Sequence, residues 1–231
     1  MPIAMPLAFL IGGYLLGSVP WAYLIGRAHG IDIRRAGSGN VGATNVSRVL
    51  GKRWGVLCFA LDFLKGLLPV AAAQACLKAG WPEATAASRD ALLMAAVCAP
   101  IAGHNWPVFL GFRGGKGVAV SAGALAALVP LPVLAAGLLW LAVFEASRYV
   151  SLASVCAALA LPFAAWGASR VGLAAASPAI LGLLAALALL VVVKHRANLR
   201  RLRDGSEPRF LRTSGTPTPP SPHASHPEST P

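Results

Sequence analysis

The sequence has few charged residues, and acidic residues are the scarcest among them. Asp and Glu together number 8 in 231 residues. Charged residues make up 12% of the chain, against about 25% in a typical soluble domain. Hydrophobic residues reach 56%, and the mean hydropathy is +0.65. This composition excludes an ordinary soluble domain, and we predict an all-α integral membrane protein.

The sequence also lacks cysteine and histidine clusters with metal-ligand spacing. Its 4 cysteines lie singly in apolar segments, which predicts neither a disulfide framework nor a zinc site, and no cofactor or metal is expected. An H-x-x-x-x-D motif is missing too, because N-W-P-V-F follows His104. No basic residue precedes the first apolar run, so we expect that run to be retained as a span rather than cleaved as a signal peptide.

Seven apolar segments are predicted to cross the bilayer. A helix rises about 1.5 Å per residue, and the hydrocarbon core is about 30 Å thick. The apolar run 117–147 is too long for one upright helix, and Pro130 and Pro132 divide it into a short fourth and a fifth span. The other predicted spans are residues 3–25, 54–79, 91–106, a sixth that follows the 148–154 turn and ends near 166, and 171–193.

Basic residues predict the orientation. The assignment puts 16 of the 20 Lys and Arg residues into loops and a tail on one side, which the positive-inside rule makes cytoplasmic. The N-terminus is then periplasmic, the C-terminus is cytoplasmic, and the polar loops converge on the cytoplasmic face of an inner membrane. The net charge of +12 is thereby explained without a nucleic-acid partner. Residues 1–212 form the predicted membrane domain, and residues 213–231, rich in Pro, Ser and Thr, are expected to be disordered.

A glycine-rich polar stretch at residues 37–48, G-S-G-N-V-G-A-T-N-V-S-R, contains many hydrogen-bond donors and no carboxylate. Its glycines permit positive-φ conformations in which successive N–H groups converge on one oxyanion, and its hydroxyls add donors. These features favour a phosphate cradle that ends on Arg48. Glycine and asparagine also mark ordinary turns, which is the alternative interpretation.

Further polar groups are predicted near the same face. Residues 111–117, G-F-R-G-G-K-G, lack the spacing and the hydroxyl of a nucleotide P-loop, and predict a phosphate site around Lys116. The alternative is a lysine that only snorkels to the interface. His195 and Asn198 share a helix face just beyond the last span. Asp62 and Lys65 share a face inside the second span, either as functional charges or as a structural pair.

These motifs, taken together and in order, resemble those of the bacterial acyl-phosphate:glycerol-3-phosphate acyltransferase family (PlsY). The resemblance covers nearly all of residues 10–207. Val120 stands where the family more often has threonine, and Arg113 where lysine is frequent; neither change removes a predicted ligand. The motifs that carry the resemblance are G-S-G-N-V-G-A-T-N (37–45) with Arg48, D-F-L-K-G (62–66), G-H-N-W-P-V-F (103–109), F-R-G-G-K-G-V-A (112–119), S-L-A-S (151–154), H-R-A-N-L-R-R-L (195–202) and G-S-E (205–207).

The resemblance implies a seven-helix enzyme that transfers a fatty acyl group from acyl phosphate to the 1-hydroxyl of glycerol 3-phosphate, giving lysophosphatidic acid. Neither acyl-CoA nor an acyl carrier protein thioester is the direct donor, and an H-x-x-x-x-D motif is not expected. Membrane lipids and coupling to the enzyme that produces acyl phosphate are the further implied partners.

The resemblance also implies roles for residues. The acyl-phosphate group would bind to Ser38, Gly39, Asn40, Thr44 and Asn45. Glycerol 3-phosphate would bind to Arg48, Lys116, one or both of Ser151 and Ser154, His195 and Asn198. The expected catalytic residues are Ser38, Arg48, Lys116 and His195, and Glu207 is expected to be structural.

The expected chemistry needs no acyl-enzyme, because an acyl phosphate is already activated. Alignment of the hydroxyl with the carbonyl and electrostatic stabilisation of the departing phosphate are sufficient. The base is either His195 or the phosphate of the substrate. Two other classes of function remain as alternatives: a transporter of an organic phosphate, which usually has repeated halves and a site at the midplane, and a structural subunit that binds anionic lipid through its basic tail.

Overall fold

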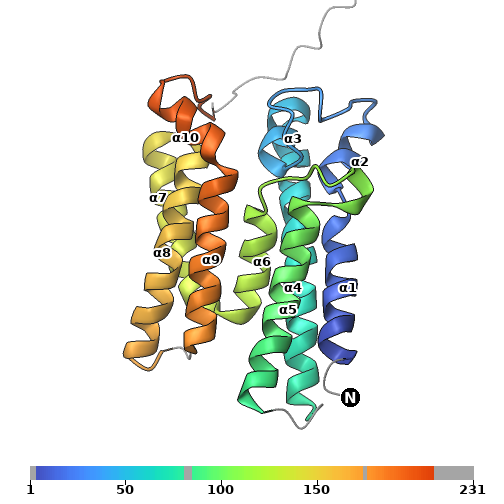
Figure 1. Cartoon of the computed structure of the whole chain (residues 1–231). Coiled ribbons are helices and arrows are strands. Elements are labelled where there is room, and N and C mark those ends of the chain that lie inside the picture. Colours follow the sequence, from blue (N-terminus) through green and yellow to red (C-terminus); the bar gives the residue numbers. More distant parts are fainter. Residues whose placement is uncertain (1–3, 81–84, 174–175, 211–231) are drawn as a thin grey trace, which may run out of the picture.

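The computed structural model describes residues 4–80, 85–173 and 176–210, and these residues form helices joined by short loops (Figure 1). No strand occurs among them. The helices are α1 (Ala4–Ser18), α2 (Trp21–Ala28), α3 (Ala43–Leu50), α4 (Lys52–Lys78), α5 (Ala86–Asn105), the 3₁₀ turn η1 (Val108–Leu110), α6 (Val118–Leu128), α7 (Pro130–Ser147), α8 (Val150–Arg170), α9 (Pro178–Lys194) and α10 (Arg196–Arg203).

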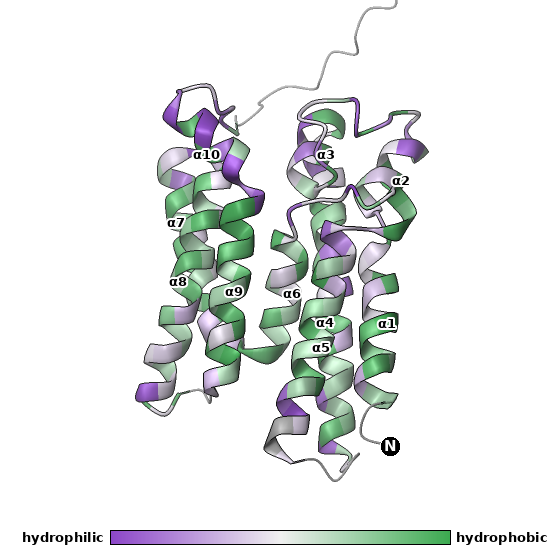
Figure 2. Cartoon of the chain, viewed as in Figure 1, coloured by the Kyte–Doolittle hydropathy of each residue, from purple (hydrophilic) through white to green (hydrophobic). Residues whose placement is uncertain are grey.

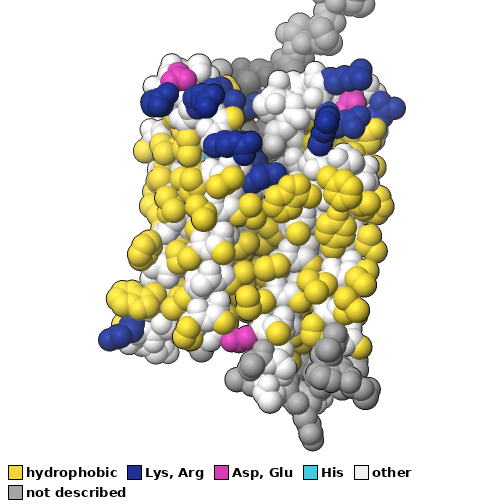
Figure 3. Space-filling model, viewed as in Figure 1, with side chains coloured by type: hydrophobic (Ala, Val, Ile, Leu, Met, Phe, Trp, Pro, Cys, Tyr) yellow, Lys and Arg dark blue, Asp and Glu magenta, His cyan; other side chains and the backbone are white. Residues whose placement is uncertain are grey.

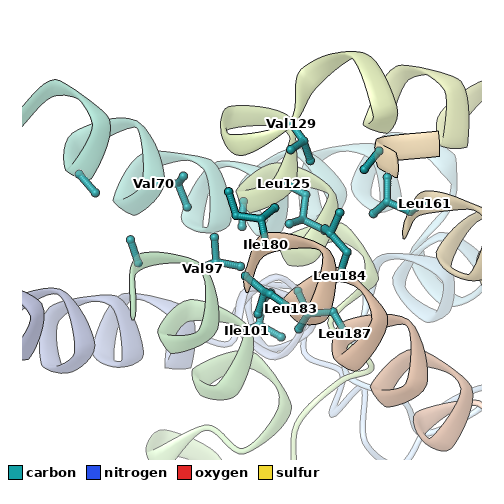
Figure 4. Packing of buried hydrophobic residues seen from close by; sticks show 14 of the residues in the cluster. Val70, Val97, Ile101, Leu125, Val129, Leu161, Ile180, Leu183, Leu184 and Leu187 are labelled. Carbon is teal, nitrogen blue, oxygen red and sulfur yellow. The ribbon is translucent and has the colours of Figure 1, made fainter. Parts of the chain in front are cut away.

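The long helices form two groups that stand side by side (Figure 1). One group contains α1, α4, α5 and α6, with α2 and α3 at one end, and the other contains α7, α8 and α9, with α10 at the same end. Side chains of α9 join the groups, because Leu183 and Leu184 lie in one buried cluster with Ile101 of α5 and Leu125 of α6 (Figure 4).

Close backbone approach fixes the contact between α4 and α6. A Cβ at Gly66 would overlap the carbonyl oxygen of Val120, and one at Gly123 would overlap that of Phe63. Small residues at helix crossings allow such contact where lipid provides no hydrophobic drive for association. The two glycines therefore set the distance between the helices.

The membrane character is confirmed, while the number of spans is only partly matched. Five helical segments are long and apolar enough to cross a bilayer, and the bent pair α9 and α10, with an angle of 57°, raises the number to six. The segment predicted as a short fourth span forms α6, whose 11 residues cover roughly 16 Å at about 1.5 Å per residue, and α6 is not among the helices long enough to cross a bilayer. Large apolar side chains such as Leu138, Phe163 and Leu189 face outward, as expected for contact with lipid.

Several predicted boundaries were wrong, and at two of the helices side-chain capping sets where the helix begins. The 37–48 stretch is not all loop, since α3 starts after Gly42 and makes Thr44, Asn45 and Arg48 helical. The predicted 148–154 turn is limited to its first two residues, and Ser151 and Ser154 lie within α8. Helix α5 begins before residue 91 because Thr85 caps it, and α9 begins after 171 because Ser177 caps it and Pro178 follows.

Other expectations at the ends of the helices were confirmed. The apolar run 117–147 is divided at Val129, directly before Pro130, as predicted. The helical chain is also interrupted between α1 and α2, at Val19 and Pro20. The tail of residues 213–231 lies outside the described residues.

Polar and basic residues gather at the end of the molecule that carries α2, α3 and α10. Hydrophilic residues concentrate there, whereas the middle of the helices is hydrophobic (Figure 2). Lys and Arg side chains collect at that end and extend to the boundary between the two groups of helices (Figure 3). The predicted convergence of the polar motifs on one face is therefore observed as an arrangement in space.

Candidate active site

All the sequence motifs meet in one cavity of about 1230 Å³ between the two groups of helices. Its walls come from residues 34–62, 104–119, 140–154 and 194–210, which lie at the end of the molecule that carries α3 and α10. Every residue predicted to bind substrate, together with the predicted structural residue, lines it: Ser38, Gly39, Asn40, Thr44, Asn45, Arg48, Lys116, Ser151, Ser154, His195, Asn198 and Glu207.

Asn45 organises the 37–48 stretch from within. Its side chain is 1% exposed, and its Oδ1 accepts the backbone N–H of Ser38 at 2.8 Å. Its Nδ2 donates to the carbonyl oxygens of Ile33 (3.1 Å) and Ala36 (3.0 Å). A buried amide with all these bonds made holds a loop in one conformation. Asn45 therefore shapes the loop that presents Ser38.

Two helices begin at the cavity with a glycine N-cap. Gly42 precedes α3 and Gly117 precedes α6, and neither helix has a side-chain hydrogen bond at its cap. The first N–H groups of a helix have no intrahelical partner, and the helix dipole makes this end attractive to anions. Residues of both first turns, Thr44 and Val118 among them, line the cavity. The cavity thus contains two helix ends of the kind that bind phosphate.

Glu207 connects residues from α8, α10 and the segment after it. Its Oε1 accepts from Ser151 Oγ (2.8 Å) and Asn198 Nδ2 (2.7 Å), and its Oε2 accepts from Arg201 Nε (2.8 Å). Burial raises the pKa of this carboxyl, but the hydrogen bonds from Asn198, Ser151 and Arg201 prevail and hold the pKa below its ordinary value. Glu207 is consequently ionised, and it orients the side chains around it.

Lys116 reaches this network from the opposite group of helices. Its Nζ donates to Asn198 Oδ1 at 2.5 Å. Burial lowers the pKa of Lys116 to about 8; the charge of Glu207 opposes this shift, and the charge of Arg201 adds to it. An ammonium group that titrates near neutral pH is stabilised by an anion bound beside it.

His195 lies at the bend between α9 and α10 and is 3% exposed. Its Nδ1 is 2.8 Å from the carbonyl oxygen of Val191, which can only accept, so Nδ1 carries the proton and Nε2 has a lone pair. Burial, followed by the charge of Lys116, lowers the pKa of His195 to about 4. At neutral pH this imidazole is uncharged, and its Nε2 can accept a hydrogen bond from a hydroxyl.

The cavity wall is strongly basic. Two carboxylates line it, Asp62 and Glu207, and both are engaged by neighbouring residues. Among the described residues, no three His, Cys, Asp or Glu side chains gather as metal ligands. The basic residues of the wall are Arg34, Arg35, Arg48, Lys52, Arg113, Lys116, Lys194 and Arg201.

Sequence reasoning missed several residues of this wall. Arg201 lies three residues after Asn198 on one helix face, which is a signal that points to it. Asp62 was singled out as an intramembrane charge but was not placed in the site. Trp140 and Phe144 line the cavity from the C-terminal half of an apolar helix, where no feature of the sequence separates them from lipid-facing neighbours.

One side of the cavity is apolar. This part of the lining contains Val56 and Phe59 of α4 and Trp140 and Phe144 of α7. The indole Nε1 of Trp140 donates to Ser154 Oγ at 3.1 Å, so the polar edge of this ring is satisfied. The ring stacks on Phe144 with their centroids 5.0 Å apart, and the two aromatic side chains form one apolar surface. The cavity thus combines a basic region for anions with an apolar wall for a hydrocarbon chain.

Comparison with known proteins agrees with this combination. The family model described as glycerol-3-phosphate acyltransferase matches residues 7–205. The chain belongs to the glycerol-3-phosphate acyltransferase family. A glycerol-3-phosphate acyltransferase of Geobacter sulfurreducens is 42% identical over 197 residues, covering 85% of this chain and 93% of that protein. One of Aquifex aeolicus is 40% identical, covering 88% of this chain and 98% of that protein.

Solved structures of the family share the fold. A crystal structure of PlsY (YgiH), an integral membrane glycerol 3-phosphate acyltransferase, in its glycerol 3-phosphate form has a TM-score of 0.76 to this chain at 39% identity. That match covers 89% of this chain and 96% of the crystallised one. The lysophosphatidic acid form gives a TM-score of 0.74 at 38% identity. The glycerol-3-phosphate acyltransferase family thus accounts for both the sequence and the arrangement of the helices.

Proposed function

We propose that this chain transfers a fatty acyl group from acyl phosphate to the 1-hydroxyl of glycerol 3-phosphate, giving lysophosphatidic acid and inorganic phosphate. The observation that carries the proposal is the single cavity in which a basic region with two helix N-termini adjoins an apolar wall. Both substrates carry a phosphate, and one also carries an alkyl chain. Family membership, at 40–44% identity to several relatives, supports the same activity.

The two phosphates are assigned to opposite sides of the cavity. The acyl phosphate is held by Ser38, Gly39, Asn40 and Thr44 at the start of α3, with Asn45 as the residue that shapes this loop. Its alkyl chain lies against the apolar wall between α4 and α7. Glycerol 3-phosphate is bound by Arg48, Lys116, Ser151, Ser154, His195 and Asn198, with Glu207 orienting Ser151 and Asn198.

The proposed reaction is a direct displacement. The 1-hydroxyl oxygen attacks the acyl carbonyl carbon, the bond from that carbon to the phosphate oxygen breaks, and inorganic phosphate leaves with the bonding electrons. Arg48 and Lys116 stabilise the negative charge that gathers on the phosphates. The N-terminal ends of α3 and α6 contribute to the same stabilisation through their free N–H groups and helix dipoles. The hydroxyl proton passes to a phosphate oxygen of the substrate. The enzyme contributes mainly alignment and electrostatics, because the donor is already activated.

His195 is proposed to bind the acceptor hydroxyl rather than to act as the base. With a pKa of about 4, its Nε2 accepts a hydrogen bond well but takes up a proton poorly. We therefore expect His195→Ala to raise KM for glycerol 3-phosphate and to lower kcat at saturating substrate by less than about tenfold. Steady-state kinetics with each substrate varied in turn measures both constants. A loss of kcat on the order of 10³ would instead assign general-base catalysis to His195.

The activity is expected to fall above about pH 8. Lys116 is protonated below its pKa of about 8 and loses its charge as the pH rises through that value, so the free enzyme binds the phosphate dianion less well. We expect kcat/KM for glycerol 3-phosphate to drop about tenfold per pH unit beyond this point. Lys116→Arg is the matched control, because the guanidinium stays charged and the profile should be flat in the same range. A falling limb that persists in Lys116→Arg would exclude Lys116 as its origin.

The same proposal includes seven crossings of an inner membrane, with α6 as a short one, the N-terminus periplasmic and the cavity open to the cytoplasm. The gathering of Lys and Arg at the cavity end supports this orientation (Figure 3). Residues 1–212 are proposed as the membrane domain and 213–231 as a dispensable tail. A functional coupling to the enzyme that makes acyl phosphate is part of the proposal, since such donors are reactive.

The experiment that tests this function uses purified protein in proteoliposomes, with labelled glycerol 3-phosphate outside and palmitoyl phosphate in the membrane. We expect labelled lysophosphatidic acid in the lipid phase. Labelled glycerol 3-phosphate trapped unchanged in the lumen, without acylated product, would favour the transporter and exclude the acyltransferase.

A further inference from the structure

Three buried polar side chains, two of which (Asp62 and His104) line the cavity, form a network that the proposed substrate contacts leave unused. Lys65 Nζ lies 2.9 Å from Asp62 Oδ1 and donates to the carbonyl oxygen of Val19 at 2.8 Å. Asp62 Oδ1 also lies 3.6 Å from Nδ1 of His104. Asp62 and Lys65 are 2% and 3% exposed. The network thus links the break between α1 and α2 to α4 and to the end of α5.

Stability alone is a poor reason for such a network. Two charges removed from water lose solvation that their attraction barely restores, and a buried ion pair can often be replaced by apolar residues without loss of stability. Intramembrane ionisable residues are more often found where they serve a function. The contacts that His104 makes with the loop around Lys116 indicate what that function is.

His104 supports the glycine-rich loop that carries Lys116. The backbone N–H of Gly115 donates to the carbonyl oxygen of His104 at 3.1 Å. A Cβ at Gly115 would overlap Nε2 of the His104 ring, so the loop rests directly on the imidazole. The carboxylate of Asp62 lies beside the other ring nitrogen, at 3.6 Å from Nδ1.

The next residue of α5 supports the loop on the far side of Lys116. Gly117 has φ +75°, and a Cβ there would lie 3.0 Å from Nδ2 of Asn105. The side chain of Asn105 is 1% exposed and lies directly under this turn. His104 and Asn105 therefore underlie the two residues that flank Lys116, and Lys116 projects from between them into the cavity.

We propose that Asp62, Lys65 and His104 form a positioning network for Lys116, which fixes its ammonium where the phosphate of glycerol 3-phosphate binds. The inference rests on the proposed function. His104 and Asp62 act through the loop and not on the reacting atoms. Loss of the network should therefore weaken binding of glycerol 3-phosphate more than it slows transfer from saturated enzyme.

The test separates orientation of His104 from simple charge balance. The double variant Asp62→Asn/Lys65→Met is neutral and close in volume, so a pair that serves only to cancel charge would be replaced without effect. His104→Gln is a second variant, which leaves the pair in place. Asp90→Asn is the control, because Asp90 accepts from Ser177 Oγ at 2.9 Å in a contact remote from the cavity.

The network variants are expected to raise KM for glycerol 3-phosphate at least tenfold, with kcat and KM for palmitoyl phosphate changed less than threefold. Asp90→Asn should behave as wild type. Added to Lys116→Met, the network variants should cause no further loss, because the residue they position is already gone.

Two results would overturn the inference. One is a wild-type KM for glycerol 3-phosphate in both the neutral double variant and His104→Gln. The other is a loss from the network variants that adds in full to the loss from Lys116→Met, because this would indicate a general loosening of the fold. A wild-type protein that forms no lysophosphatidic acid from palmitoyl phosphate would refute the proposed function itself, and the wild-type reaction in the same assay distinguishes the two failures.

Discussion

Replacing Lys116 by methionine is expected to lower kcat/KM for glycerol 3-phosphate by roughly 10²- to 10³-fold, the loss that follows removal of one preorganised donor to developing negative charge. Methionine keeps the apolar stem and removes only the charge. Lys116 Nζ contacts Asn198 across the cavity, beside the N-terminus of α6. It therefore lies where a phosphate would bridge the two groups of helices. Initial rates with purified protein at about pH 7, where the lysine is still charged, measure the effect.

Lys78→Met is the matched control for this prediction. Lys78 ends α4 and is not among the residues that line the cavity, so its loss should change kcat/KM less than twofold. If Lys116→Met retained activity within threefold of wild type, Lys116 would be an interfacial lysine only, and the glycerol 3-phosphate subsite would have to lie elsewhere in the cavity.

A leucine at Gly66 is expected to prevent the native packing of α4 on α6. Its Cβ would overlap the carbonyl oxygen of Val120, a main-chain atom that cannot yield without moving α6 as a whole. Overpacking of a close-packed contact commonly costs 1–3 kcal/mol, and a backbone clash exceeds that, so a loss of more than about 3 kcal/mol in the free energy of unfolding is expected. The N-terminus of α6 lines the cavity, so displacement of α6 should abolish activity as well.

The recovery of a single monodisperse peak in detergent and the midpoint of thermal unfolding measure this prediction. Gly137→Leu is the control, because Gly137 is exposed in the middle of α7 and a Cβ there meets nothing within 4 Å. Equal recovery and equal midpoints for the two variants would show that α4 and α6 separate easily, against the packing described above.

Much of the fold could be predicted because apolar runs and proline breaks are local features. The break at Val129 followed from Pro130 and Pro132. Helix α3 was missed because the polar residues that build it have weak helix propensity, and burial of its Val46 against the neighbouring segments overrides that weakness. Capping by Thr85 and Ser177 likewise set boundaries that hydropathy alone could not.

The candidate site was predictable where residues came in motifs and not where the fold supplied them singly. The Gly-rich segments and the His195 region were all assigned to one face, and one cavity collects them. The support beneath Lys116 depends on a contact between Asp62 on α4 and His104 on α5, whose distance no spacing in the sequence encodes. Whether Asp62 pairs with Lys65 was equally undecided, and the structure gives an ion pair of 2.9 Å.

The identity of the acyl donor tests the central claim most directly. Purified protein in detergent, with a metal chelator present, is given labelled glycerol 3-phosphate together with either palmitoyl phosphate or palmitoyl-CoA. A cavity built for two phosphates and one alkyl chain predicts lysophosphatidic acid from palmitoyl phosphate and none from the thioester. Product from palmitoyl-CoA at a comparable rate would contradict the assignment of the Ser38 loop to an acyl-phosphate group.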